Sequence, residues 1–389
     1  MDRPRTIIHF DLDAFFCAVE EQYQPSLRGT PFAVGGRPGG RGVVASCSYA
    51  ARRFGIRSAM PMSAAVRLCP QLVVIPPRRE AYERASGKVM ERLYRLTPAV
   101  ERISIDEAFL DATGCPEPGR RLAESLQGTV RQDLALPCSL GVSANKLVAK
   151  IANTVGKSAS PGNRPPNAVT VVPPGRESAF LSPLPVSELW GVGPRATERL
   201  NAAGIRTIGH LAEFPEGELV RLLGGAHARQ LAHWARGRDD SPVTASRVAK
   251  SISKETTFPR DVSSETHLHA ALLHLSEGVG RELRRARAAS RTIRLKFRRP
   301  DFITLTRQAT LPAPTDEDFA IYAEAKRLLR LVWQPGQPVR LLGVAASGLC
   351  GPYQLSLWHD RSPRLQEAID SLRDAYGDTA VRWAKEVQR

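Results

Sequence analysis

Residues 6–17 read TIIHFDLDAFFC and residues 103–111 read ISIDEAFLD. Each stretch contains the β-branched and aromatic residues that are typical of a buried strand. Each also contains carboxylates, with Asp11 in the first stretch and Asp106 and Glu107 in the second. A carboxylate at the end of a buried strand is unfavourable unless cationic groups meet it. The mixture of strands and helices around the two stretches predicts an α+β or α/β core, with carboxylates at the ends of two of its strands.

The second stretch predicts one long strand. Val100 to Ile105 alternates apolar and polar residues, and Ala108 to Asp111 continues in extended form. A regular strand would place Asp106 and Glu107 on opposite faces of the sheet.

The carboxylates suggest metal chemistry. Asp11, Asp106 and Glu107 would repel one another on adjacent strands unless divalent cations lay between them. Magnesium binds through carboxylates together with substrate phosphates. Two such ions about 3.5–4 Å apart can activate an attacking oxygen and stabilise a leaving one, which is phosphoryl-transfer chemistry. The alternative is that these residues are solvated acids at strand ends.

Composition favours a polyanionic partner. The 389 residues include 55 lysines and arginines against 39 aspartates and glutamates, for a net charge of +16. A basic, well-mixed chain is a candidate for nucleic-acid binding, although an unspecialised basic protein is the alternative. The six cysteines form no CxxC pair, and we find no signal peptide and no long apolar run. We therefore expect a cytoplasmic protein without membrane contact.

Basic residues that could bind phosphate lie in two places. Tyr49 and Arg52 would share one face of a short helix. Arginine suits bidentate contact with phosphate oxygens, and a tyrosine hydroxyl can donate to another. Lys157, just past a helix, is a further candidate. The alternative for each is a solvated surface cation.

A glycine turn predicts a second kind of phosphate contact. Residues 189–193 read LWGVG, and Pro194 then opens a helix. The free amides of Gly191 and Gly193 would face a DNA phosphate, as in a helix-hairpin-helix that contacts the backbone and not the bases. A plain helical hairpin is the alternative.

Cations are concentrated between residues 281 and 299. There, Glu282 alone opposes Arg281, Arg284, Arg285, Arg287, Arg291, Arg294, Lys296, Arg298 and Arg299. This excess predicts a surface that follows DNA phosphates, with Arg284, Arg285 and Arg287 as contacts. A solvated cationic face is the alternative.

Four motifs in this order resemble the Y-family translesion DNA polymerases, of the bacterial DNA polymerase IV type. They are HFDLDAFFCAVE (9–20), GVVASCSYAARRFGIRSAMP (42–61), ISIDEAFLD (103–111) and GVSANKLVAKIAN (141–153). The glycine turn and the segment KSISKETTF (250–258) extend the resemblance to roughly residues 6–358.

The resemblance implies a multidomain α+β right-hand polymerase. The expected parts are a palm (1–20 and 76–172), small fingers (21–75), a helical thumb with the helix-hairpin-helix (173–240), a linker (241–249) and an α+β little finger (250–352). A clamp-binding peptide (353–358) and a C-terminal helical tail (359–389) would follow.

The resemblance also implies roles for single residues. Asp11 and Asp106 would bind two Mg²⁺ ions, Glu107 would bind the ion that activates the primer 3′-hydroxyl, and Leu12 would offer its backbone carbonyl. Phe16 would be the steric gate against a 2′-hydroxyl. Tyr49, Arg52 and Lys157 would contact the dNTP triphosphate, although KSASPGN replaces the family's usual KPNG after the lysine. The small residues Ala45, Ser46 and Ala59 would roof the nascent base pair.

The implied activity is low-fidelity DNA synthesis across lesions on primer–template DNA, by a monomer without an exonuclease. Two other functions are considered: an inactive polymerase-like accessory protein, and a nucleotide cyclase with a similar palm. The complete carboxylate set and the aromatic gate argue against the first, and the basic second half argues against the second.

The sequence QLSLW resembles the short peptide by which bacterial polymerases bind the sliding clamp. Gln354, Leu355, Leu357 and Trp358 would make this contact, with tryptophan in place of the usual phenylalanine. The alternative is that these residues form the last edge strand of the little finger, or pack against the tail.

Overall fold

The computed structural model describes residues 4–159, 162, 164–245, 248–351, 363–377 and 380–381. The chain divides into two compact units, Met1–Arg247 and Val248–Arg389. Within the described part of the chain, every helix is too short or too polar to cross a membrane.

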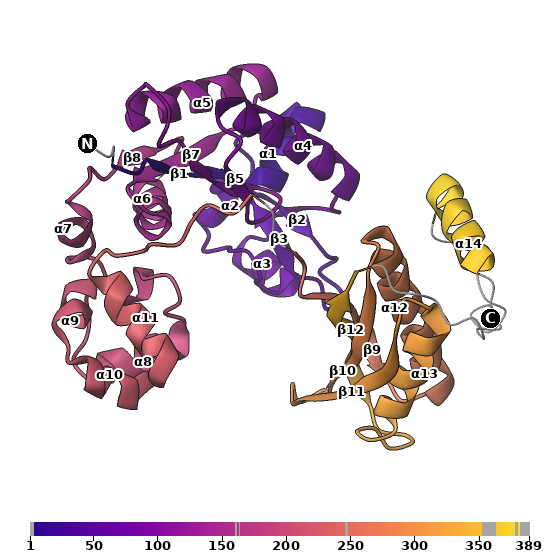
Figure 1. The fold of residues 1–389 in the computed structure, drawn as a ribbon. Helices are drawn as coiled ribbons and strands as arrows, with labels where there is room; N and C mark the ends of the chain where they lie inside the picture. Colours follow the sequence, from indigo (N-terminus) through magenta and orange to yellow (C-terminus); the bar gives the residue numbers. More distant parts are fainter. Residues whose placement is uncertain are drawn as a thin grey trace. The chain divides into compact units, whose positions relative to one another are not determined.

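The first unit is centred on a five-stranded sheet with the order β5-β6-β1-β7-β8, which we call the palm sheet. Its strands are β1 (Ile7–Leu12), β5 (Val100–Arg102), β6 (Glu107–Asp111), β7 (Cys138–Ser143) and β8 (Val169–Val171). Figure 1 shows helices on both faces of this sheet. One face is covered by α1 (Phe15–Tyr23), α4 (Arg79–Leu96) and α5 (Gly119–Leu134), and the other by α6 (Lys146–Ser158).

Alternation along β1 separates core residues from site residues. Ile8 and Phe10 belong to the large core beneath α1, α4 and α5. Ile7 packs on the other face with Phe109 of β6 and Ala149 of α6. His9 and Asp11 share this second face with Ile7, so their polar side chains are directed toward α6.

The expected single strand from Val100 to Asp111 is wrong. β5 and β6 are two strands paired antiparallel, with Val100 opposite Leu110, and a tight turn joins them. The backbone NH of Ile103 donates to the carbonyl of Glu107 at 2.9 Å. The Ser104 hydroxyl accepts from the backbone NH of Asp106 and donates to its carboxylate. A serine that bonds the backbone two residues ahead favours a turn over a strand, and Asp106 therefore lies in the turn.

A smaller sheet in the same unit has the order β3-β2-β4 and forms the fingers layer. Its elements are β2 (Phe32–Gly35), β3 (Val44–Cys47), β4 (Val73–Ile75), α2 (Tyr49–Arg52), α3 (Met62–Leu68) and the 3₁₀ turn η1 (Pro25–Leu27). Ser48 caps α2 by accepting from the NH of Ala51, which fixes the start of the helix that carries Tyr49 and Arg52.

Short helices complete the first unit, as expected from the glycine-punctuated sequence. They are α7 (Glu177–Leu181), η2 (Val186–Glu188), α8 (Pro194–Ala202), α9 (Ile208–Glu213), α10 (Glu216–Leu223) and α11 (Gly225–Ala235). Gly191 has φ +91°, a backbone conformation that favours glycine, and Gly193 precedes α8. Leu147 and Ile151 of α6 belong to the same core as these helices. The helical cluster is therefore packed onto the palm through α6.

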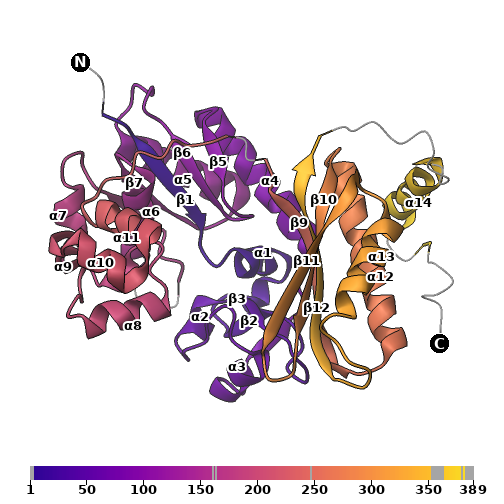
Figure 2. The same cartoon turned by 60° about the horizontal axis from the view of Figure 1, so that its bottom comes forward.

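The second unit is a four-stranded antiparallel sheet with the order β11-β10-β12-β9 and helices on one face (Figure 2). Its elements are β9 (Ser251–Val262), α12 (Glu265–Arg285), β10 (Ala289–Arg298), β11 (Thr304–Thr315), α13 (Asp318–Leu329) and β12 (Val339–Cys350). Ile293, Leu295 and Phe297 of β10 are buried in the core with α12 and α13. By alternation, Arg294 and Lys296 point to the open face of the sheet.

The arginines of α12 lie on the helical side and carry ion pairs, several of them to α14 (Pro363–Tyr376). The Arg284 guanidinium contacts Asp318 at 2.9 Å and Asp370 at 2.6 Å. Arg285 pairs with Asp374 at 2.5 Å. Arg287 is exposed just beyond α12. The expected phosphate contacts Arg284 and Arg285 are therefore already engaged by carboxylates of the same unit.

Candidate active site

Strand pairing brings the predicted carboxylates together at one edge of the palm sheet. Asp11 of β1 lies directly opposite Glu107 of β6. The backbone NH of Leu12 donates to the carbonyl of Asp106 at 3.0 Å, which holds the turn beside β1. Leu12 also lines the cavity described below, and its side chain is buried in the palm core.

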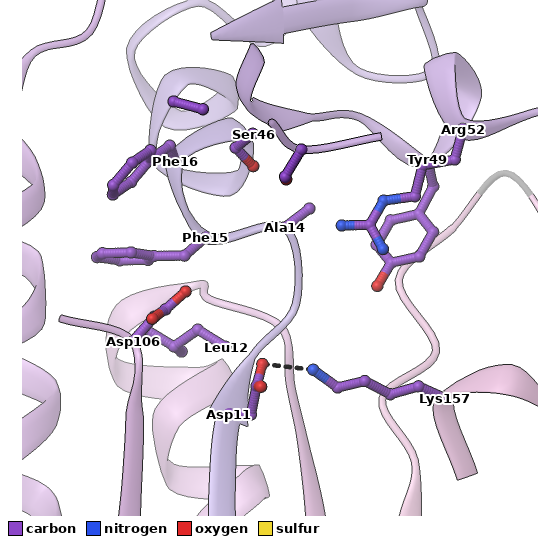
Figure 3. A pocket seen from close by; sticks show the side chains of 12 residues that line it. Asp11, Leu12, Ala14, Phe15, Phe16, Ser46, Tyr49, Arg52, Asp106 and Lys157 are labelled. Atoms are coloured by element: carbon purple, nitrogen blue, oxygen red, sulfur yellow. Dashed lines mark hydrogen bonds and ion pairs between the residues drawn. The ribbon is translucent and has the colours of Figure 1, made fainter. Parts of the chain in front are cut away.

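A cavity of about 230 Å³ lies between this edge and the fingers layer (Figure 3). Predicted site residues from both parts line it: Asp11, Leu12, Phe16, Ala45, Ser46, Tyr49, Arg52, Asp106 and Lys157. Glu107 and Ala59 are not among the lining residues. The cavity thus joins the acidic sheet edge, the aromatic gate and the three predicted triphosphate contacts.

Lys157, at the C-terminal end of α6, neutralises the first carboxylates. Its ammonium contacts Asp11 and lies 3.2 Å from Asp13. Burial raises the pKa of Asp11 to about 6, and the neighbouring Asp106 and Glu107 act in the same direction, while Lys157 opposes them. The environment of Asp11 therefore disfavours its negative charge, and a bound cation would relieve this.

Asp13 has a structural role. Its side chain is fully buried, and its Oδ2 accepts from the Ser139 hydroxyl at 2.8 Å and from the backbone NH of Asn167 at 3.1 Å. These bonds tie the end of β1 to β7 and to the segment before β8. Asp13 is thus held away from the cavity that Asp11 lines.

Glu107 is held by two donors that the sequence did not single out. His9 Nε2 lies 2.7 Å from Glu107 Oε1, and the Lys150 ammonium contacts the same oxygen. Burial acts to raise the pKa of Glu107, but the bonds from His9 and Lys150 outweigh it and hold the pKa below its usual range. Glu107 is therefore ionised throughout the physiological range.

Phe16, the predicted steric gate, packs against an aromatic side chain of α4. The Phe16 ring stacks on Tyr82 of α4, with centroids 4.2 Å apart and an interplanar angle of 14°. The Tyr82 hydroxyl donates to the buried Glu20 carboxylate at 2.6 Å. A ring that is stacked and anchored in this way cannot turn aside easily, which suits a residue that must exclude one extra oxygen atom.

Tyr49 and Arg52 form a polar wall of the cavity on α2. The Arg52 guanidinium lies 4.5 Å from the centroid of the Tyr49 ring. Burial raises the pKa of Tyr49, and the nearby carboxylates Asp13 and Asp11 add to this effect. The Tyr49 hydroxyl therefore stays protonated and can donate a hydrogen bond to an anion.

The donor chemistry of the site suits a hard divalent cation. In the part of the chain that the structure describes, no three His, Cys, Asp or Glu side chains lie close enough to hold a metal ion. Carboxylate oxygens are nevertheless the ligands that such cations prefer, and ammonium groups already lie against Asp11 and Glu107. The residues therefore fit a divalent cation that takes the place of an ammonium.

One face of α6 supplies all of these palm contacts. Lys146 binds Glu101, Lys150 binds Glu107, Asn153 binds His9 and Lys157 binds Asp11. These four residues are spaced by four, three and four positions, which is one helical stripe. Because Lys150 and Asn153 share this stripe with Lys157, their spacing in the sequence could have indicated that they also face the acidic strands.

Three family models match the chain. The impB/mucB/samB family matches residues 10–154, its C-terminal domain matches residues 249–357, and the IMS family HHH motif matches residues 174–205. The chain is 40% identical to DNA polymerase IV of Desulfatibacillum aliphaticivorans, covering 96% of this chain and 95% of that protein. It is 45% identical to DNA polymerase IV of Streptomyces coelicolor, covering 91% and 73%.

Solved structures agree with these matches. A Y-family DNA polymerase chimera superimposes with a TM-score of 0.78 at 27% identity, covering 89% of this chain and 99% of that one. DinB from Sulfolobus solfataricus has a TM-score of 0.60 at 27% identity, covering 88% and 98%.

The fold and the site together define a right-hand polymerase with palm, fingers, helical thumb and little finger. The chain belongs to the Y family of DNA polymerases, in its DNA polymerase IV branch.

Proposed function

We propose that this chain carries out low-fidelity, DNA-templated DNA synthesis across lesions, adding dNTPs to a primer 3′-hydroxyl. One observation supports this above all: the carboxylates Asp11 and Asp106, the gate Phe16 and the three predicted triphosphate contacts line a single cavity. The expected domain boundaries, the cytoplasmic location and the monomeric state belong to the same proposal.

Asp11, Asp106 and Glu107 would hold two Mg²⁺ ions, and the backbone carbonyl of Leu12 would add a ligand. When bound, the ions would lower the pKa of the primer hydroxyl and stabilise the charge on the leaving pyrophosphate. The chain's own contribution is position: strand register places Asp11 opposite Glu107, and the Ser104 turn holds Asp106 beside them.

The triphosphate would be bound by Tyr49, Arg52 and Lys157. Arg52 would give a bidentate contact, Tyr49 a neutral donor and Lys157 a point charge. Lys157 now lies against Asp11 and Asp13. Arrival of divalent cations would compete with its ammonium for Asp11, which would leave Lys157 available for the nucleotide phosphates.

Low fidelity would follow from the roof of the cavity. Ala45 and Ser46 line it with small side chains. They leave room above the nascent base pair for a damaged base, and few close contacts mean weak discrimination between substrates.

DNA would be held mainly by backbone contacts from the thumb and the little finger. The turn at Gly191 and Gly193 opens onto α8, whose first amides can face a phosphate. In the little finger we keep the exposed Arg287 and now add Arg294 and Arg298 of the open sheet face, which donate to the neutral side chains of Gln308 and Thr304. Arg284 and Arg285 are ion-paired on the helical side, and Lys296 is ion-paired with Glu255 at 2.7 Å.

Replacing Arg294 and Arg298 together with alanine is expected to weaken duplex binding equally on all sequences. The slope of log affinity against log salt should fall by about one to two units, since each phosphate contact contributes close to one. Fluorescence anisotropy at several salt concentrations would measure this. Arg285→Ala is the matched control and should leave the slope unchanged. If Arg285→Ala lowered the slope and the double variant did not, the DNA contacts would lie on α12 instead.

We also propose that Gln354, Leu355, Leu357 and Trp358 bind the sliding clamp. These residues lie outside the described residues, between the end of β12 and the start of α14. A tether raises the effective concentration of the enzyme at the primer end without new template contacts.

The double variant Leu357→Ala with Trp358→Ala is expected to keep clamp-free extension and melting temperature, and to lose stimulation by a loaded clamp. If the residues were core instead, each change would cost about 2–5 kcal/mol and the melting temperature would drop. A lower melting temperature with clamp stimulation intact would contradict the tether.

A primer-extension assay tests the proposed function directly. Undamaged and lesion-containing templates would be extended with Mg²⁺ and each dNTP singly. Template-dependent addition, with frequent mispairing and addition opposite the lesion, is expected. DNA binding without extension would identify an inactive accessory protein, and template-free formation of a cyclic nucleotide would identify a cyclase.

A further inference from the structure

A series of hydrogen bonds between buried polar side chains runs from α6 through β1 to the acidic edge of the palm sheet. Asn153 Nδ2 lies 2.9 Å from His9 Nδ1, and His9 Nε2 lies 2.7 Å from Glu107 Oε1. His9 and Asn153 are 2% and 1% exposed. The His9 ring also meets Phe109 edge-on, with centroids 4.8 Å apart. His9, Asn153 and Glu107 do not line the cavity itself, but Glu107 lies opposite Asp11, which does, so His9 reaches the acidic edge through Glu107.

The hydrogen bonds determine which nitrogen of His9 carries the proton. Asn153 Nδ2 also donates to the carbonyl of Ser139 at 3.0 Å, which sets the orientation of the amide. With its NH₂ group directed at His9, Asn153 can only donate, and His9 Nδ1 must accept. The ring proton therefore lies on Nε2 and is donated to Glu107.

A neutral histidine holds a carboxylate without cancelling its charge. A second proton on His9 would set Nδ1–H against the Asn153 NH₂ group, so the geometry disfavours the imidazolium. Lys150 binds the same Glu107 oxygen but carries a charge, so an incoming cation would repel Lys150 and leave His9 in place.

We propose that His9, oriented by Asn153, is a positioning residue that holds Glu107 through its Oε1 and leaves Oε2 available to a divalent cation. This rests on the proposed polymerase function of Glu107. His9 would then be a neutral hydrogen-bond donor to a metal-binding carboxylate. Loss of such a donor typically lowers metal affinity or activity by about 10- to 100-fold.

Four variants test the proposal. His9→Leu removes the donor, and His9→Gln restores a neutral NH the same number of bonds from the backbone. Phe109→Leu is the matched control, because it removes the aromatic packing of His9 but no hydrogen bond. Asn153→Ala is a second route to the same effect, in case His9→Leu does not fold.

The first measurement is the affinity for Mn²⁺, determined by calorimetry. The sample is the full chain in complex with a dideoxy-terminated primer–template and dNTP. His9→Leu should weaken Mn²⁺ binding by about 10- to 100-fold, and Asn153→Ala should weaken it in the same direction. His9→Gln should recover most of the affinity, and Phe109→Leu should keep it. DNA affinity should be unchanged in all four variants.

The second measurement is single-nucleotide insertion. His9→Leu should lower kcat with little change in KM for dNTP, because the triphosphate contacts are elsewhere. Wild-type Mn²⁺ affinity and kcat in folded His9→Leu or Asn153→Ala would overturn the proposal. So would His9→Gln behaving like His9→Leu, or Phe109→Leu losing as much Mn²⁺ affinity as His9→Leu. Failure of the wild-type chain to extend primers would instead overturn the proposed function.

Discussion

Asp106→Asn and Glu107→Gln are each expected to reduce primer extension by about a thousandfold or more. A divalent cation supplies several kcal/mol of charge stabilisation in the transition state, and each loss of about 1.4 kcal/mol is tenfold in rate. The amides keep the shape of the carboxylates but not their charge. Single-turnover extension under saturating dNTP and Mg²⁺ would measure the loss.

The folds of both variants should survive, because each amide retains an oxygen for its neighbour. Asn at 106 can still accept from the Ser104 hydroxyl, and Gln at 107 from His9. DNA affinity should stay near that of the wild type, because the proposed duplex contacts lie in the thumb and the little finger. Asp133→Asn, a carboxylate distant from the cavity, serves as the control. Extension by either site variant within tenfold of wild type would show that the carboxylate assignment is wrong.

Phe16→Ala is expected to admit ribonucleotides. The ring would pack beneath the sugar, and its removal opens space for the 2′-hydroxyl. A hydrophobic pocket rejects a substrate that differs by one added hydroxyl by about 100-fold, so the ratio of deoxy- to ribonucleotide incorporation should fall by about that factor. Deoxynucleotide incorporation should fall much less. Steady-state kcat/KM for dNTP and rNTP pairs would measure both.

Phe16→Tyr provides the matched comparison. It retains the ring that stacks on Tyr82 at 4.2 Å and should preserve discrimination. Because Phe16 packs at the edge of the palm core, melting temperatures of both variants should be recorded. An unchanged sugar preference in folded Phe16→Ala would count against Phe16 as the gate.

Much of the site was predictable because its residues lie in short motifs. Asp11 and Asp106 follow hydrophobic segments, Phe16 lies on the next helix, and Tyr49 and Arg52 share one helix face. Each of these relations is local, within a few residues, where secondary-structure periodicity controls side-chain direction. The structure brings them to one cavity, as the resemblance implied.

The hairpin between β5 and β6 was not predictable from alternation. Val100–Asp111 has the composition of a continuous strand, but Ser104 bonds the backbone and side chain of Asp106 and turns the chain. The turn is stabilised by pairing of β6 with β1, a partner almost a hundred residues away. Local pattern carries no information about such a partner.

The arginines of α12 show the same limit. Their number predicts a phosphate-binding surface, yet Arg284 forms ion pairs with Asp318 and Asp370, which are far from it in sequence. Net charge in a segment does not reveal which charges are paired, because ion pairs form across elements. Alternation separates Arg294 and Lys296 from Ile293, Leu295 and Phe297, and the core shared with α12 and α13 shows which of the two faces the helices cover.

The sequence by itself indicated the class of enzyme through motifs that resemble the Y family, and it singled out most of the residues that line the cavity, because these lie in short motifs of recognisable chemistry. Tertiary structure alone decided that α6 packs against β7 and β1, with side chains that reach Glu107 and Phe109 of β6. That packing places Lys150 on Glu107, Lys157 on Asp11 and Asn153 behind His9. Contacts between distant segments follow from how helix and sheet bury their apolar faces, and so the partners of each catalytic carboxylate were visible only in the fold.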